Sequence, residues 1–278
     1  MLKTRIITAL LLFSGFFGAL LYLPPLGWAG FAALIATIAF WEWGGLMKLP
    51  NSSRLFMSAF CLVIIATLIA FFPEALGIEG DFAKTAWSVG CWFYLPAGLF
   101  WLFLVPFWLR WQWRLSHPVI GYIVGMVVIL PTWLALVQFR HLGGGVLLAV
   151  MAVAWLADTA AYFTGRALGR RKLAPTISPG KTWEGAIGGG VAVLLYGFLL
   201  SPQLPEGLVE NKPLLFFALA LSAAISVIGD LFESMLKRQA GLKDSSNLLP
   251  GHGGVLDRID SLTSLLPLVA LLWFGVGF

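Results

Sequence analysis

The stretch PVIGYIVGMVVILPTWLALVQF, residues 118–139, decides the fold class, because its 22 successive positions carry no charged side chain. As an α-helix it would be about 33 Å long. That length is enough to cross the hydrocarbon core of a bilayer, which is roughly 30 Å thick. A helix also pairs its backbone N–H and C=O groups internally, as hydrocarbon requires. The stretch therefore predicts a transmembrane helix.

Eight further apolar runs resemble this one. Hydrophobic residues make up 59% of the 278 positions and charged residues 11%, whereas soluble domains carry roughly 25% charged residues. This composition excludes a soluble globular domain and predicts an all-α, polytopic integral membrane protein with about nine transmembrane helices. The first run continues to Leu23 without a small-residue cleavage site, which favours a retained helix over a signal peptide. The nine runs are 6–23, 27–47, 55–72, 86–109, 118–139, 145–166, 184–201, 213–232 and 261–277.

The basic residues predict the orientation. With nine spans, fifteen of the 18 Lys and Arg residues fall on the side of the N-terminus, and only Lys84, Arg140 and Lys212 fall on the other. Cytoplasmic loops of membrane proteins are enriched in Lys and Arg. We therefore expect a cytoplasmic N-terminus and a C-terminus outside. The first two runs are so closely joined that a re-entrant pair is an alternative there.

The two parts of the chain differ in polarity. Residues 1–143 hold the first five predicted helices and few polar groups within them. Residues 144–278 hold helices six to nine and two polar cytoplasmic stretches, roughly 165–183 and 233–260. We interpret the second part as the catalytic region, with its active-site loops in the cytoplasm.

The last cytoplasmic stretch combines carboxylates with basic residues. Asp230 ends the eighth predicted span, and Asp257 and Asp260 share a helix face at the start of the ninth. Carboxylates without nearby His or Cys suit a hard cation such as Mg²⁺, while Lys and Arg suit phosphate oxygens. Helix-end charges, with Glu233 and Lys237 as an i,i+4 pair, are the alternative. The candidate catalytic residues are Asp230, Asp257, Asp260, Lys237, Arg238, Lys243, Arg258 and His252, with the three aspartates as metal ligands.

The other polar stretch reads Ser-Pro-Gly-Lys-Thr-Trp-Glu-Gly at residues 178–185. A P-loop is excluded, because Pro175 occupies the required upstream glycine position and no strand is predicted before it. A Pro-Gly turn, a lysine and hydroxyls at the start of a helix still suit a phosphate. Asp158, in the last turns of the sixth span, is costly at membrane depth and is a further functional candidate, whereas Glu42, between two tryptophans, receives no role. The candidate substrate-binding residues are Ser178, Lys181, Thr182, Ser234, Gly253 and Gly254.

These residues carry a family resemblance. The pattern Ser234-x2-Lys237-Arg238-x4-Lys243-Asp244, followed by His252-Gly253-Gly254-x2-Asp257-Arg258-Ile259-Asp260, resembles the signature of the phosphatidate cytidylyltransferase (CDP-diacylglycerol synthase) family. Residues 178–185 are similar to a second stretch typical of that family. The resemblance implies conversion of phosphatidic acid and CTP to CDP-diacylglycerol and pyrophosphate. It also implies Mg²⁺, together with a second, monovalent cation such as K⁺.

The remaining expectations concern His252 and the surroundings of the protein. The lipid phosphate is already ionised, so we expect His252 to be a hydrogen-bond donor or turn residue rather than a base. The expected partners are CTP, phosphatidic acid and the lipid bilayer, with no nucleic acid, and a homodimer is compatible with the sequence. Short loops favour a multi-pass protein of a bacterial inner (cytoplasmic) membrane with its active site facing the cytoplasm.

Two other functions remain as alternatives for this sequence. A CTP-dependent polyprenol kinase is a related membrane enzyme that also acts on phosphorylated lipids. An ion-coupled transporter would use Asp158 and Asp230, but transporters place such residues near the bilayer midplane, often in paired repeats. Here the charges cluster at helix ends, and no internal repeat is visible.

Overall fold

The computed structural model describes residues 2–203 and 211–276. Within these ranges nine helical segments are long and apolar enough to cross a membrane, which confirms the predicted architecture. The C-terminal Phe278 lies outside the described residues. The longer helices are α1 (Leu2–Tyr22), α2 (Pro25–Leu46), α3 (Asn51–Phe71), α4 (Phe82–Leu99), α6 (Pro118–Leu142), α7 (Gly144–Leu168), α8 (Trp183–Leu200), α10 (Lys212–Ala240) and α11 (Leu256–Val276).

The fourth span is composite. α4 passes into a π-helical segment, Phe100–Leu104, and then into the short helix α5 (Val105–Trp111). This segment and α5 surround Phe232 of α10 with aromatic rings: the ring centroids of Trp101 and Trp108 lie 5.6 and 5.4 Å from that of Phe232. The fourth span thereby supports α10, which carries several candidate site residues.

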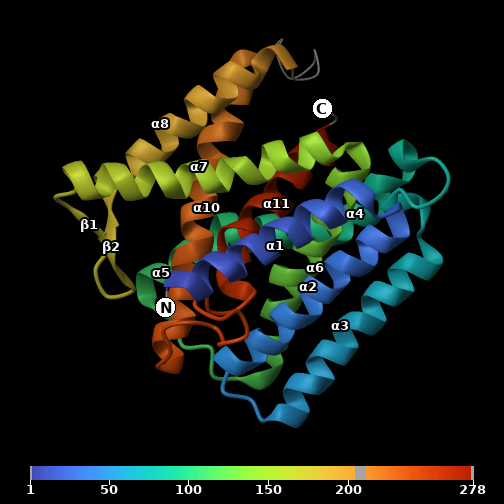
Figure 1. The fold of residues 1–278 in the computed structure, drawn as a ribbon, viewed down its shortest axis with the longest axis horizontal. Coiled ribbons are helices and arrows are strands. Elements are labelled where there is room, and N and C mark those ends of the chain that lie inside the picture. Colours follow the sequence, from blue (N-terminus) through green and yellow to red (C-terminus); the bar gives the residue numbers. More distant parts are fainter. Residues whose placement is uncertain (1, 204–210, 277–278) are drawn as a thin grey trace.

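Helix α11 is the centre of the bundle. It packs against α10, α4, α6 and α7, as Figure 1 shows, and Leu265 and Leu266 are fully buried on it. The Thr132 hydroxyl of α6 lies 3.3 Å from the Thr263 carbonyl of α11. Two of the first five spans, α4 and α6, therefore serve as a packing surface for the last helix.

Small residues bring α7 and α8 close together. A Cβ at Gly185 would come within 2.7 Å of the Ala161 carbonyl oxygen, and one at Gly189 within 2.6 Å of the Ala157 carbonyl oxygen. Glycines spaced in this way allow helices in membranes to approach closely. The close approach fixes α7 against α8 at the end where the polar stretches lie.

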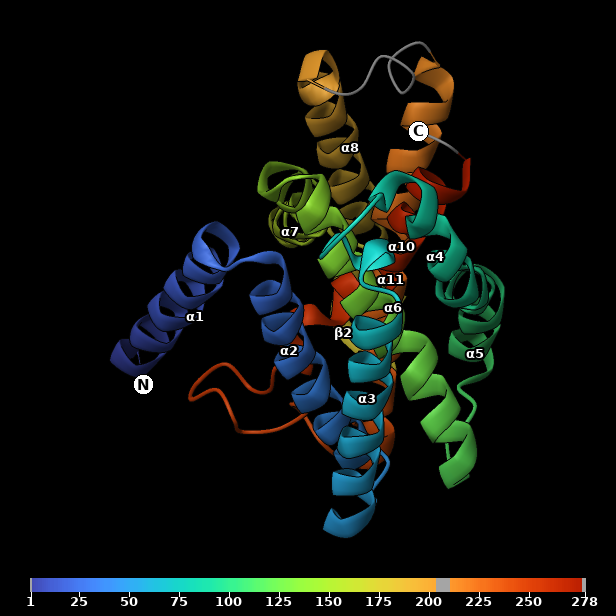
Figure 2. The same ribbon diagram turned by 90° about the vertical axis from the view of Figure 1, so that its right-hand side faces the viewer.

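Helix α1 stands apart from the rest of the bundle, as Figure 2 shows. Its Phe13 and Tyr22 side chains are 63% and 85% exposed. Its first turns approach the loop before α11, where the Thr8 hydroxyl donates to the Pro250 carbonyl at 3.1 Å. α1 and α2 are separate helices, each long enough to cross, so the structure does not favour a re-entrant pair.

Two local features differ from the sequence expectations. α10 continues to Ala240, eight residues beyond the predicted span, so Glu233, Ser234 and Lys237 lie on a helix rather than in a loop. The residue after the helix is Gly241, whose φ of +76° favours glycine. The polar stretch after α7 forms an antiparallel hairpin of β1 (Lys172–Ala174) and β2 (Ser178–Thr182).

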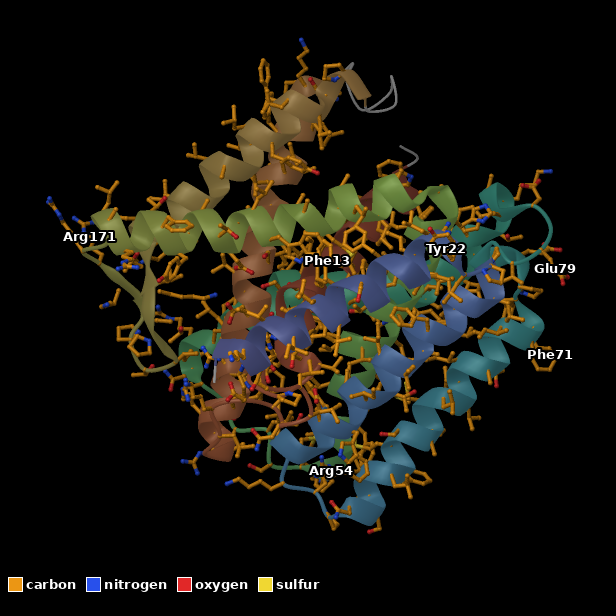
Figure 3. The ribbon with its side chains drawn as sticks, in the orientation of Figure 1. Phe13, Tyr22, Arg54, Phe71, Glu79 and Arg171 are labelled. Carbon is orange, nitrogen blue, oxygen red and sulfur yellow. The ribbon has the colours of Figure 1, made fainter. Side chains whose placement is uncertain are left out.

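The hairpin corrects one detail of the sequence interpretation. Pro179 and Gly180, predicted to form a turn, lie within β2, and the chain reverses at residues 175–177 instead. Proline is tolerated in a strand whose edge is unpaired, and β2 has only β1 as a neighbour. In Figure 3, Arg171 beside the hairpin and Glu79 lie on opposite sides of the molecule.

Candidate functional site

A cavity of about 480 Å³ lies where α7, α8, β2, α10 and α11 meet. Both polar stretches of the sequence contribute to it. The side chains of Ser178 and Thr182 line it, and so do four carboxylates and two basic groups. These are Asp158, Asp230, Asp257 and Asp260, with Arg166 and Lys181.

Lys181 forms an ion pair with Asp230. The Lys181 Nζ atom of β2 lies 2.6 Å from Oδ2 of Asp230 on α10, and both side chains remain about a quarter exposed. The Ser234 hydroxyl, one turn further along α10, donates to Oδ1 of Asp230 at 3.1 Å. Lys181 thus supplies the counter-charge of Asp230. Ser234 orients the same carboxylate by its hydrogen bond.

Two more carboxylates face the same cavity with few partners. The Ser261 hydroxyl donates to Oδ2 of Asp158 at 3.1 Å, and the Ser261 backbone N–H donates to Oδ1 of Asp260 at 2.7 Å. Both lie within electrostatic range of Asp230. We call Asp158, Asp230 and Asp260 the cavity carboxylates. Like charges so arranged repel one another unless a cation compensates them.

Asp257 is held differently. The Lys237 Nζ atom lies 2.7 Å from Oδ1 of Asp257 and 2.7 Å from Oε2 of Glu233. Oδ2 of Asp257 accepts from the Gly254 N–H at 2.7 Å and from the Ser245 N–H and hydroxyl, both at 2.8 Å. Both carboxylate oxygens are therefore engaged by the protein itself.

The glycines of the His-Gly-Gly sequence permit this close approach. Gly253 has a φ of +80°, and a Cβ there would lie 2.6 Å from Oδ2 of Asp257. A Cβ at Gly254 would overlap the Ser245 hydroxyl. The backbone that was expected to approach a phosphate instead approaches a carboxylate. The His252 N–H donates to the Leu249 carbonyl at 2.8 Å, in keeping with a turn residue.

The other predicted residues have structural contacts or lie outside the cavity. The Thr182 hydroxyl accepts from the Gly185 N–H at 3.1 Å and caps α8. The Arg238 Nη1 atom donates to the Leu242 carbonyl at 3.2 Å. Lys243 and Arg258 are exposed, and neither lines the cavity.

Glu42, which has no role in the sequence analysis, contacts the start of α11 next to the site. Its side chain is 1% exposed, and its carboxylate accepts from the Val255 N–H at 3.0 Å and the Leu256 N–H at 2.7 Å. We call Glu42 and Asp257 the anchored carboxylates. The signal that could have found Glu42 is its position inside an apolar run, where a carboxylate is costly unless it is paired.

The residues fit a divalent cation only in part. Asp158, Asp230 and Asp260 are oxygen donors on one cavity, and such donors suit Mg²⁺. Asp257, predicted as the third ligand with Asp230 and Asp260, has both oxygens engaged. In the part of the chain that the structure describes, no three Asp, Glu, His or Cys side chains are close enough together to hold an ion as they stand.

A second cavity, of about 690 Å³, is lined mainly by apolar side chains of α7, α8, α10 and α11. Its residues lie further along the same four helices, away from the carboxylates. Val153 lies five residues before Asp158 on α7, and Leu219 lies eleven residues before Asp230 on α10. The two cavities therefore follow one another along the helices, one polar and one apolar.

Comparison with known proteins identifies the family. The sequence profile described as "Cytidylyltransferase family" matches residues 3–275. A phosphatidate cytidylyltransferase of Pseudomonas aeruginosa is 39% identical, with 100% of this chain and 99% of that protein covered. One of Haemophilus influenzae is 34% identical, with 99% and 100% covered, and one of Brucella suis is 37% identical, with 100% and 94% covered. The chain therefore belongs to the cytidylyltransferase family.

Proposed function

We propose that this protein converts phosphatidic acid and CTP to CDP-diacylglycerol and pyrophosphate. An oxygen of the lipid phosphate attacks the α-phosphorus of CTP, and the bond from that phosphorus to the oxygen bridging to the β-phosphorus breaks. Pyrophosphate leaves with the electron pair of that bond. The observation that carries the proposal is the polar cavity, where carboxylates and basic groups of both signature stretches meet.

The basic groups on the cavity suit the anionic substrates. Both substrates carry phosphate charge, so catalysis depends on neutralising and orienting them. Lys181 and Arg166 can each face a phosphate oxygen from the cavity wall. Lys181 would then exchange its contact with Asp230 for one with the substrate.

The cavity carboxylates are the residues that would hold Mg²⁺. When bound, the ion would supply positive charge to the phosphates and the departing pyrophosphate. Asp257 would act by holding Lys237 and the loop before α11, not as a ligand. This is a change from the ligand set expected from the sequence.

The apolar cavity suits an acyl chain of phosphatidic acid. It follows the polar cavity along the same helices, as the tails of a lipid follow its phosphate. Its volume of about 690 Å³ lies in the usual range of small-molecule pockets, roughly 300–1,000 Å³. A lipid could therefore present its phosphate to Lys181 while one chain remains among apolar side chains.

We further propose that the polar cavity faces the cytoplasm of a bacterium, with the protein in the inner membrane. The distribution of Lys and Arg supports this orientation. A fusion of alkaline phosphatase after Phe278 should be active, and a fusion of green fluorescent protein should be dark. The reverse pattern would contradict the orientation.

The reaction is tested with purified protein in detergent. Phosphatidic acid is mixed with each radiolabelled nucleoside triphosphate in turn, with Mg²⁺ or with a chelator, and the label in chloroform-soluble lipid is counted. We expect label only with CTP and Mg²⁺, and only when phosphatidic acid is present. Equal labelling with ATP, or label transferred to a polyprenol instead, would contradict the proposal.

A further inference from the structure

The carboxylate of Glu42 joins the N-terminal half of the chain to the loop that precedes α11. Glu42 lies on α2, one turn before its end at Leu46. Oε1 accepts from the Ser246 hydroxyl at 2.6 Å and the Val255 N–H at 3.0 Å. Oε2 accepts from the Leu256 N–H at 2.7 Å and lies 3.2 Å from the Ser245 hydroxyl. One side chain thus contacts both ends of the loop.

The direct contacts of the Glu42 carboxylate are hydrogen-bond donors, and the nearby positive charge is Arg54 of α3, which lies within electrostatic range. Among the residues that the structure describes, no Lys or Arg forms an ion pair with this carboxylate. Val255 and Leu256 stand at the first turn of α11, where backbone N–H groups and the helix dipole favour an anion. Glu42 is therefore the capping acceptor of α11, supplied from a helix more than 200 residues earlier in the sequence.

This cap lies next to the site. Asp257 follows Leu256 directly, and Asp260 comes three residues later on the same helix. The Ser245 hydroxyl lies between the two anchored carboxylates, 2.8 Å from Oδ2 of Asp257 and 3.2 Å from Oε2 of Glu42. Any shift of the Glu42 carboxylate therefore moves the start of α11 and the groups around Asp257.

We propose that Glu42 is a positioning residue for the reaction: it fixes the start of α11, and with it the placement of Asp257 and Asp260. The inference rests on the proposed function. Glu42 does not line the polar cavity, so it acts through α11 and the loop rather than on substrate.

The test is a single-atom exchange with a matched control. Glu42→Gln keeps the size of the side chain but turns an NH₂ group toward a backbone N–H. Gln138→Met is the control, because Gln138 is also fully buried. Its Nε2 atom donates to the Ala75 and Ala86 carbonyls at 2.8 and 3.1 Å. Gln138 lies near the end of α6 remote from the polar cavity.

Two measurements separate positioning from stability alone. Mutation of groups that orient the ligands of a site typically lowers activity by about 10–100-fold. We expect Glu42→Gln to lower kcat per folded enzyme by this factor, with KM for CTP within about threefold. Hydrogen–deuterium exchange should become faster in residues 241–256. Gln138→Met should lower the thermal midpoint while leaving kcat and the exchange of that segment unchanged.

The proposal is overturned if Glu42→Gln keeps wild-type kcat per folded enzyme, whatever its stability. Loss of turnover without faster exchange in residues 241–256 would also overturn it.

If Glu42→Gln does not fold, Ser246→Ala decides, since it removes only the 2.6 Å contact with Glu42. That variant should exchange faster and turn over severalfold more slowly, and wild-type values for either would overturn the proposal. Wild-type protein without turnover would contradict the proposed function, and exchange alone would then decide whether Glu42 anchors the loop.

Discussion

The cavity carboxylates lie on α7, α10 and α11 and the anchored carboxylates on α2 and α11, and the protein treats the two sets in opposite ways. Asp257 accepts hydrogen bonds from Lys237, Gly254 and Ser245, and Glu42 accepts from two backbone N–H groups and a hydroxyl. Asp158 and Asp260 each accept one bond, in both cases from Ser261. The anchored pair has its partners within the protein, whereas Asp158 and Asp260 have unused oxygens beside a cavity. Asp230 shares its two oxygens with the part-exposed Lys181 and with Ser234.

This difference separates residues that shape a site from residues that can bind a ligand. A buried carboxylate with all its partners in place is rigid and gains nothing from a new one. A carboxylate with unused lone pairs near other carboxylates gains from a cation. Mutations should therefore affect activity and stability in different proportions in the two sets.

The largest loss of activity should come from a cavity carboxylate. Asp260→Asn should lower the rate of CDP-diacylglycerol synthesis about 100–1,000-fold, the size of effect seen when a group that stabilises transition-state charge is removed. Its thermal midpoint should stay the same or rise, because repulsion with Asp158 and Asp230 is relieved. Synthesis from radiolabelled CTP and a thermal unfolding curve measure the two effects.

The control for this variant is Asp81→Asn. Asp81 pairs with Lys84 at 3.1 Å at the other end of the molecule, where both side chains are exposed. Asp81→Asn should not change the rate of CDP-diacylglycerol synthesis. Wild-type turnover in Asp260→Asn would remove Asp260 from the site, and a large fall in its thermal midpoint would break the distinction between the two sets.

An anchored carboxylate should show a smaller loss of activity and a clear loss of stability. Asp257→Asn leaves Lys237 with Glu233 as its remaining carboxylate partner and turns an amide toward buried donors. Each buried group left unsatisfied costs about 1–3 kcal/mol, and we expect a destabilisation of that order with a 10–100-fold lower rate. Chemical unfolding in detergent measures the first quantity. A variant that loses activity at full stability would place Asp257 with the cavity set.

The ion pair between Lys181 and Asp230 should give the smallest effects. Lys181→Ala should lower the rate about tenfold through weaker substrate binding, visible as a higher KM. Because both side chains are about a quarter exposed, its loss should cost only about 0–1 kcal/mol. Lys84→Ala, which breaks the exposed pair with Asp81, is the matched control. A rate within about twofold of wild type, roughly 0.4 kcal/mol, would leave Lys181 as a determinant of topology only.

The transmembrane helices could be read from the sequence because each must be apolar over its own length. The helix at residues 118–139 could be predicted without knowing which helices pack against it, and the structure places α6 at Pro118–Leu142. Helix ends in polar sequence were harder to predict. α10 continues through Glu233 and Lys237 because Lys237 pairs with Glu233 on the same helix and with Asp257 on α11, which local hydropathy does not report.

The site could be predicted as a set of residues but not as a set of contacts. The two signature stretches do meet on one cavity, through Lys181 of the one and Asp257 and Asp260 of the other. All four aspartates line the cavity, and contacts with Ser245, Gly254 and Lys237 in three dimensions decide that Asp257 is the one held by the protein. Glu42 was missed because its nearest partner in the sequence is Ser245, 203 positions away, and no motif spans that distance.

The contact between α2 and α11 also has a consequence for the order in which the chain is made. Glu42 and Leu256 are 214 residues apart, so at about 5–20 residues per second Glu42 leaves the ribosome roughly 10–40 seconds before its partner. During that interval its carboxylate lacks the donors of Ser245, Ser246, Val255 and Leu256. Synthesis of α11 therefore completes the hydrogen bonds of a residue in the first half of the chain. A chain that stops before residue 256 lacks the Leu256 N–H that Glu42 accepts from.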